Sequence, residues 1–336
     1  MIKKRNLDPS LVQWIMTQTG LGPGIGEIFY VAPASSSTSQ FRTQLQSMGV
    51  RDERIYTLPS LAYADMVAYR NDVMLVAPGA YAETAELAWS KAFCHLIGLG
   101  GNNSQAGDYS EASVALYTET ANVASTLTVT GQYSQFHNLA IENNYSDADN
   151  LTAVTINIYG TTWKNVGFHG HMAATQNTTA AAASLYIAGN GMYPLIEDCQ
   201  IGQDVWGTRS GANSGVMRFS ASTGRPNGAT IRNCKFLSRS ITASCALVAV
   251  PAAQCIGRSW LFENCHFSNF YDETTLLTQV FYTVTGTQKF TIQLKNCSAT
   301  GYNEWQTGNF DVVVADMPIT GQGGGLMRAP TAQVGS

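Results

Sequence analysis

Short runs of apolar and β-branched residues recur along the middle of the chain, separated by stretches rich in Gly, Asn and Thr. Such runs are typical of short β-strands that alternate with turns. A second short apolar run follows each of them, for example Trp260-Leu261-Phe262. The pattern predicts a mainly β protein with about three strands and no helix in each period. The leading runs are 127–129, 154–158, 185–187, 216–219, 247–250 and 280–284.

A short motif follows each second run. It is an Asn or Asp, a small or apolar residue, any residue, and then an apolar one, as in Asn264-Cys265-His266-Phe267. The spacing between copies is close to constant, which indicates one supersecondary unit stacked many times. The Asn or Asp positions, separated by 27, 33, 35, 31 and 32 residues, are Asn138, Asn165, Asp198, Asn233, Asn264 and Asn296.

The order of residues around this motif requires a bend in the chain. Phe262 and Cys265 are both of a type that packs inside, yet a straight strand would place them on opposite faces. We therefore expect a bend at Glu263-Asn264, because Asn is the non-Gly residue that best accepts the left-handed conformation. Stacked Asn and Asp side chains would then hydrogen-bond from coil to coil. This predicts a single-stranded right-handed parallel β-helix.

The segment before the repeats resembles a known family. Residues 72–84 look like the opening coil of pectin-lyase-like β-helix proteins, and so does Leu96-Ile97-Gly98-Leu99-Gly100-Gly101 one coil later. Residues 26–31 resemble the first strand of the cap of that family, and 59–68 resemble its capping helix. The resemblance covers roughly 26–300 and extends to β-helix proteins of bacteriophage particles. It implies a small N-terminal α/β cap.

The ends of the chain lie outside the solenoid. We expect an N-terminal helix and Gly-rich arm over 1–25, the α/β cap over 26–71, the parallel β-helix over 72–308, and a C-terminal strand and flexible arm over 309–336. Asp8-Pro9 would begin the N-terminal helix. Both arms carry apolar residues that could dock on a partner, namely Leu11, Trp14, Ile15, Leu326 and Met327.

Composition excludes several classes of protein. The net charge of −4 and the absence of a basic stripe argue against a nucleic-acid binder. The chain has no apolar run long enough to span a membrane and no apolar core of a signal peptide. Charged residues make up only 12% of its 336 residues, which is about half the usual share. Seven cysteines without a CxxC pair predict reduced thiols rather than a disulfide framework.

Paired carboxylates are the first candidate chemistry, because glycoside hydrolysis uses two of them about 5–9.5 Å apart. Glu197 and Glu263 would lie two coils apart in the row before the bend, with Arg232 between them. The alternation of charge along this row favours an ion ladder on the outer surface. An acid/base pair of Glu197 and Glu263 is the alternative. The row consists of His137, Lys164, Glu197, Arg232, Glu263 and Lys295.

The remaining candidates favour structural roles. Cys199, Cys234, Cys265 and Cys297 occupy the inward position that holds Leu or Val in earlier coils, so packing explains them. His169-Gly170-His171 offers two ligands where a metal site needs three or four, and we expect two polar loop histidines. We predict no metal and no cofactor. Four aromatic residues could bind sugars, dock a subunit or pack in the core: Trp206, Tyr271, Tyr302 and Trp305.

The sequence as a whole favours a structural role. We expect a virion protein of a bacteriophage, assembled in the host cytoplasm, that decorates or cements the capsid and contacts the major capsid protein. By analogy with other solenoids, we expect a homo-oligomer, namely a homotrimer. The alternative is a tail fibre or tailspike that binds, and possibly cleaves, a cell-surface polysaccharide. We expect no enzyme in the first case and a polysaccharide hydrolase in the second.

Overall fold

The structure is a computed structural model of residues 1–336. The described residues are 26–33, 39–100, 114–145, 147–171, 178–202, 208–221, 226–252, 256–271, 276–284, 291–307 and 313–315. The expected N-terminal helix with Leu11, Trp14 and Ile15 lies outside the described residues, as does the tail with Leu326 and Met327. None of the helices in the described ranges has the length and apolarity to span a membrane.

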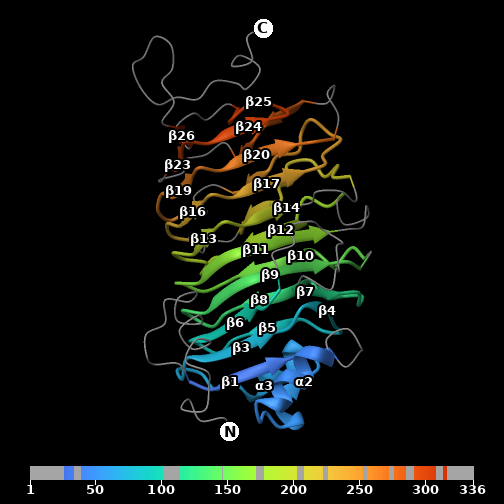
Figure 1. The fold of residues 1–336 in the computed structure, drawn as a ribbon. Helices are drawn as coiled ribbons and strands as arrows, with labels where there is room; N and C mark the ends of the chain where they lie inside the picture. The colour runs from blue at the N-terminus through green and yellow to red at the C-terminus, as the bar shows by residue number, and fades with distance from the viewer. Residues whose placement is uncertain are drawn as a thin grey trace.

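A small α/β cap begins the described chain (Figure 1). Its strands β1 and β2 run parallel, and β1 also pairs with the first strand of the β-helix. Helix α3 is the capping helix that the resemblance implies, and it begins at Pro59. Glu83 accepts a hydrogen bond from the Ser60 N–H in the first turn of this helix. The cap elements are β1 (Ile28–Val31), α2 (Ser39–Ser47), the 3₁₀-helix η3 (Asp52–Arg54), β2 (Ile55–Tyr56) and α3 (Pro59–Asp65).

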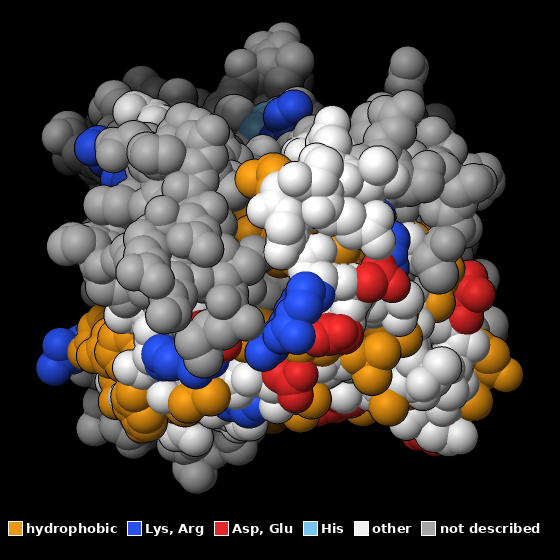
Figure 2. Space-filling view, turned by 60° about the horizontal axis from the view of Figure 1, so that its bottom comes forward, with side chains coloured by type: hydrophobic (Ala, Val, Ile, Leu, Met, Phe, Trp, Pro, Cys, Tyr) orange, Lys and Arg blue, Asp and Glu red, His pale blue; other side chains and the backbone are white. Residues whose placement is uncertain are grey.

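A buried carboxylate joins the cap to the first coil. Asp72 has no exposed surface, and its oxygens accept hydrogen bonds from the Arg70 guanidinium at 2.6 Å and from the backbone N–H groups of Glu27 and Val67. Figure 2 shows this end of the molecule, where Lys and Arg side chains lie beside Asp and Glu side chains. Ion pairs such as Arg42–Asp52 hold the surface of the cap.

The rest of the described chain is a right-handed parallel β-helix, as the sequence predicts. Each coil contributes one strand to a seven-stranded sheet, then turns and contributes strands to a seventeen-stranded sheet. In the six coils that carry the motif, these strands lie on both sides of the Asn bend. We call the two sheets the groove sheet and the large sheet. The groove-sheet strands are β5 (Leu87–Trp89), β8 (Ser125–Val129), β10 (Thr152–Ile156), β12 (Ala183–Ile187), β15 (Met217–Phe219), β18 (Val248–Val250) and β22 (Phe281–Thr283).

The large sheet runs from the cap to the last coil, and the pairs between its strands are parallel (Figure 1). Besides β1 and β2 it contains β3 (Asp72–Val76), β4 (Gly79–Glu83), β6 (Cys94–Gly98), β7 (Val114–Thr118), β9 (Gln135–Asn143), β11 (Thr162–His171), β13 (Leu195–Glu197), β14 (Gln200–Gly202), β16 (Thr230–Arg232), β17 (Lys235–Ser238), β19 (Trp260–Glu263), β20 (His266–Asn269), β23 (Ile292–Lys295), β24 (Ser298–Thr300) and β26 (Val313–Ala315). A separate two-stranded sheet pairs β21 (Leu277–Gln279) with β25 (Tyr302–Glu304).

The six bend residues of the motif form a ladder. All of them have left-handed backbone, with φ between 51° and 58°. Their side chains bond from coil to coil: Asn165 donates to Asn138 at 2.9 Å, Asn233 donates to Asp198 at 3.1 Å and Asn264 donates to Asn233 at 3.2 Å. The bend therefore turns the chain in each of these six coils, and its side chains link neighbouring coils.

The residue after the bend starts a column of buried thiols. Cys199, Cys234, Cys265 and Cys297 are all buried, and Val166 and Leu139 continue the column toward the cap. Each sulfur lies 3.0–3.5 Å from the carbonyl oxygen two residues earlier. The thiols thus satisfy their weak donors on the backbone and behave as small core residues.

Candidate functional site

The charged row before the bend is in the expected register. Neighbouring strands align Lys164 with Glu197, Glu197 with Arg232, Arg232 with Glu263 and Glu263 with Lys295. The Arg232 guanidinium pairs with the Glu197 carboxylate, and the Lys295 ammonium lies 2.6 Å from the Glu263 carboxylate. Each carboxylate therefore has a cation of the next coil as its partner.

The cations beside Glu263 work against a role of this carboxyl group as a general acid. A general acid in a glycosidase needs a raised pKa so that it holds its proton near neutral pH. The hydrogen bond from Lys295 and the charges of Lys295 and Arg232 instead lower the pKa of Glu263. The pairing of both carboxylates with cations of neighbouring coils supports the ion ladder.

The expectation of two polar loop histidines is wrong for His169. This residue lies in β11 with no exposed surface. The strand register shifts between Phe168 and Gly170, and Gly170 has a φ of +67°. The His169 ring folds back over Gly167, where a Cβ would lie 2.2 Å from its Nε2. Its Nδ1 lies 3.3 Å from the Oε1 of buried Glu142, so a local bulge buries this imidazole on a carboxylate.

The aromatic candidates separate into core and surface residues. Tyr302 and Trp305 are buried, and Trp305 packs edge-on against Phe267 at 5.5 Å between ring centroids. Tyr271 is on the surface, 5.8 Å from the Arg239 guanidinium. Trp206 lies outside the described residues. Sugar stacking by Tyr302 and Trp305 is therefore excluded by their burial.

A groove that the sequence did not indicate lies on the outer face of the groove sheet. The next-to-last residue of each groove-sheet strand points away from the core, while the residues on either side of it, such as Leu127 and Val129 beside Thr128, are fully buried. The parallel register places these outward residues side by side in one row. The row runs Ala88, Thr128, Thr155, Tyr186, Arg218, Ala249 and Tyr282.

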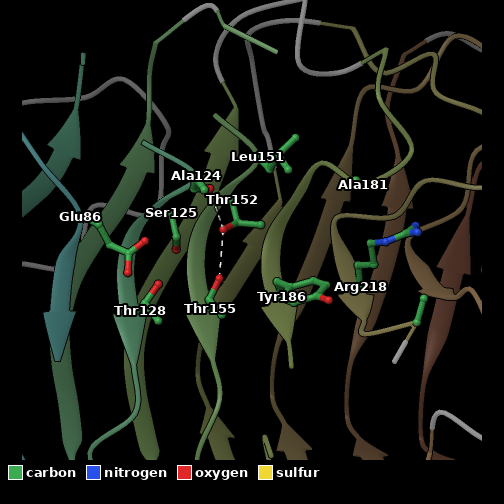
Figure 3. Close-up of a pocket in the computed structure, with 11 residues that line it drawn as sticks. Glu86, Ala124, Ser125, Thr128, Leu151, Thr152, Thr155, Ala181, Tyr186 and Arg218 are labelled. Carbon is green, nitrogen blue, oxygen red and sulfur yellow. Dashed lines mark hydrogen bonds between the residues drawn. The ribbon is translucent and has the colours of Figure 1, made fainter. Parts of the chain in front are cut away.

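The middle of this row forms the floor of the groove, whose volume is about 430 Å³. Figure 3 shows Glu86 at one side and Arg218 at the other, with Thr128, Thr155 and Tyr186 between them. Four inter-strand steps separate β5 from β15, which corresponds to about 19 Å at 4.7–4.9 Å per step. The groove is therefore long, shallow and directed along the axis of the β-helix.

The groove offers hydroxyl groups, one aromatic ring and one charge of each sign. The hydroxyls of Thr152 and Thr155 lie 3.2 Å apart, and the Arg218 Nη1 donates to the Ala180 carbonyl at 2.7 Å. Glu86 is the one carboxylate among the residues that line it, and these residues include no His and no Cys. Such a surface can bind a hydroxyl-rich chain by hydrogen bonds and stacking.

Among the described residues, no group of three or more His, Cys, Asp and Glu side chains is arranged to hold a metal ion. The Glu142–His169 pair offers two such groups and is buried away from solvent.

Known structures share the architecture of this chain. The pectin methylesterase PemA from Erwinia chrysanthemi is 12% identical with a TM-score of 0.44, and the match covers 84% of this chain and 70% of that enzyme. The deglycosylated pectin methylesterase from Aspergillus niger is 13% identical with a TM-score of 0.45, over 87% of this chain and 92% of that enzyme. ORF18 of Geobacillus virus E2 is 12% identical with a TM-score of 0.35, over 76% of this chain and 56% of that protein.

These likenesses concern the pectin-lyase-like β-helix fold alone, because fold does not determine function. No protein-family model matches the sequence, and no characterised protein matches it.

Proposed function

We propose that this chain binds a polysaccharide along the outer face of the groove sheet, as a tail fibre or tailspike binds the polysaccharide of a cell surface. The observation that carries the proposal is the groove from Glu86 to Arg218, whose floor consists of the side chains of Thr128, Thr155 and Tyr186. Its length suits several sugar units in line. Its hydroxyl groups and single ring suit the hydroxyl groups and apolar faces of sugars.

Binding without cleavage fits the groove better than hydrolysis. Hydrolysis of a glycosidic bond by the common mechanism needs two carboxylates near the scissile bond. The described lining residues provide Glu86 alone. The pair of Glu197 and Glu263 lies on the large sheet, where cations of neighbouring coils engage both residues.

Substitutions in the groove test this proposal. A panel of purified capsular and O-chain polysaccharides serves as the probe. We expect Tyr186→Ala and Arg218→Met each to weaken binding by about tenfold or more, as for a central contact of an interface. Tyr282→Ala is the matched control, because Tyr282 belongs to the same outward row but lies beyond the groove. Wild-type affinity in both groove variants would contradict the proposal, and shortening of the polysaccharide chains would add hydrolysis to it.

Capsid decoration is the second candidate, and its support is the pair of apolar terminal arms in the sequence. The abundance of the chain in a purified particle separates the two. We expect tail stoichiometry relative to the major shell protein, measured by quantitative mass spectrometry. Shell stoichiometry would favour decoration, and absence from the particle would leave the polysaccharide assay as the sole test.

A further inference from the structure

A row of aromatic side chains lies on the surface at the turn from the groove sheet into the large sheet. Its members precede five strands that are neighbours in the large sheet, namely β3, β6, β9, β11 and β13. Ring centroids are 5.9 Å apart for the first two rings, 5.1 Å for the second and third, and 5.4 Å for the third and fourth. We call this set the aromatic row: Tyr69, Phe93, Tyr133, Tyr159 and Tyr193.

The backbone of the aromatic row is unfavourable for such residues. Tyr69, Phe93, Tyr133 and Tyr193 have φ of 63°, 57°, 56° and 51°. Bulky side chains rarely adopt this region, whereas Gly and Asn adopt it at little cost. The Asn bend of the coils that follow Tyr133, Tyr159 and Tyr193 uses Asn or Asp, so a residue with a lower conformational cost is used for left-handed backbone elsewhere in these coils. Residues kept in a strained conformation are a reason to look for a function of their side chains.

The rings lie over the turns and remain open to solvent. A Cβ on Gly160 would lie 2.7 Å from two carbons of the Tyr133 ring, so Gly at this position makes room for it. Tyr69, Tyr133 and Tyr193 are nevertheless 71%, 44% and 47% exposed. Core packing would bury these rings. Several exposed aromatic rings on one surface are typical of a binding surface.

The turns at the last three rings are polar but uncharged, whereas Arg70 follows Tyr69, Lys91 precedes Phe93, and the Arg258 guanidinium lies 5.9 Å from the centroid of the Tyr193 ring. The turns 130–134, 157–161 and 188–194 contain no Asp, Glu, Lys, Arg or His. They contribute amide and hydroxyl groups instead, for example those of Gln132, Asn157 and Asn190. Beyond them, a groove of about 350 Å³ adjoins Tyr193 and includes Thr230 and Ser259 in its lining. The middle of this surface therefore offers stacking and neutral hydrogen bonds. Of the nearby cations, Arg70 is engaged by the Asp72 carboxylate and Lys91 by backbone carbonyl groups.

We infer that the aromatic row binds an uncharged glycan chain that runs parallel to the β-helix axis, with the apolar faces of its sugars on the rings. The ring spacing of 5.1–5.9 Å is close to the length of one sugar unit in an extended chain. The amides and hydroxyls beside the rings match the hydroxyl edges of sugars. The ligand class rests on the proposed function, while the surface lies outside the groove of Glu86 and Arg218.

The test uses variants that keep the backbone conformation. Asn tolerates a positive φ, so Tyr133→Asn and Tyr193→Asn remove a ring without adding strain. The probes are cellohexaose, xylohexaose and mannohexaose, with hexagalacturonate as the anionic comparison, and affinity is measured by calorimetry on the full chain. We expect the wild type to bind at least one neutral hexamer and each variant to weaken that binding by about tenfold. Tyr133→Phe, which keeps the ring, should bind as the wild type does.

Controls separate this inference from the proposed function. Tyr271→Asn removes an exposed ring outside the row and should leave binding of the hexamer unchanged. Arg218→Met should weaken the polysaccharide bound in the groove but not the hexamer bound on the row. Failure of the wild type to bind any neutral hexamer, or equal binding by Tyr133→Asn, would overturn the inference. Conversion of an oligomer to a monomer by Tyr133→Asn in sedimentation would instead assign the row to self-association and overturn it too.

Discussion

At the scale of the residue, two series of non-glycine residues with left-handed backbone recur from coil to coil. At the bend the chain uses Asn or Asp, whose side chains both accept the conformation and bond to the next coil. At the turn before the large sheet it uses aromatic residues, whose rings stay on the surface. The Asn and Asp residues of the bend stabilise the fold, whereas the left-handed backbone of the aromatic residues destabilises it. The contrast allows the two contributions of a bend residue to be measured separately.

Asn264 is suited to that measurement, because it donates to Asn233 and has a φ of 54°. Asn264→Gly keeps the conformation and loses the hydrogen bond, so we expect a loss of about 1 kcal/mol in the free energy of unfolding. Asn264→Ala loses both, and we expect about 2 kcal/mol or more. Urea unfolding of both variants checks this. Equal losses would mean that the conformation carries no cost here.

Two buried histidines give the stability a pH dependence. His95 has no exposed surface, and neither of its ring nitrogens has a hydrogen-bond partner. Burial and the nearby His137 lower the pKa of His95 to about 4, and burial and Lys164 lower the pKa of His137 to about 4. The unfolded chain then binds more protons between this value and the unperturbed pKa of about 6.5. The stability that the neutral rings contribute is therefore complete above about pH 6.5 and is lost as the pH falls toward 4.

His95→Met tests this dependence, because Met fills a similar space and does not titrate. Each lowered pKa corresponds to at most about 3 kcal/mol between the two limits. We expect the urea midpoint of the wild type to fall between about pH 6.5 and pH 4.5, and that of the variant to fall less. Identical slopes would assign the dependence to the carboxylates, which both proteins share.

At the scale of the element, burial in one column lowers the reactivity of the cysteine thiols. Burial raises the pKa of Cys234 well above its usual value. A hydrogen bond with Cys234, together with burial, raises the pKa of Cys265 to about 12. Because the thiolate is the reactive form, we expect iodoacetamide to label these cysteines only in unfolded protein. Mass spectrometry of labelled peptides reads this out, and Cys265 labelled as fast in native protein as in urea would refute it.

The elements that the sequence predicted are those whose signal is local. The residue type of Asn264 predicts a bend. The odd spacing of the two inward residues Phe262 and Cys265 predicts the same bend, so a few residues per coil are enough to predict the β-helix. His169 was predicted to be a polar loop residue, because the sequence His-Gly-His is typical of a loop. The bulge that buries its ring depends on the neighbouring strand, which the local sequence does not show. The groove was missed, because Thr155 and Tyr186 are ordinary strand residues until the register sets them side by side. The next-to-last residue of each strand, compared from one repeat to the next, carries that signal.

At the scale of the whole molecule, the stability of each coil depends on the coils directly before and after it. Each coil pairs with the coil before it and the coil after it, as β10 does with β8 and β12. In such stacks a terminal coil has one neighbour and opens first. We expect hydrogen exchange to be slowest in β10 and β12 and faster in β23 and β24, measured by mass spectrometry of native protein. Uniform exchange at the rate of global unfolding would mean that the solenoid unfolds as one cooperative unit.

The register that aligns the bend ladder also sets the length of the proposed binding surfaces by the number of coils. Both proposed surfaces run along the axis, so their length is counted in coils and not in loop residues. Duplicating one coil would lengthen each surface by one inter-strand step of about 4.8 Å and leave the chemistry of the existing coils in place. Selection could therefore change the number of units that such a protein spans in discrete steps, without redesigning a single contact.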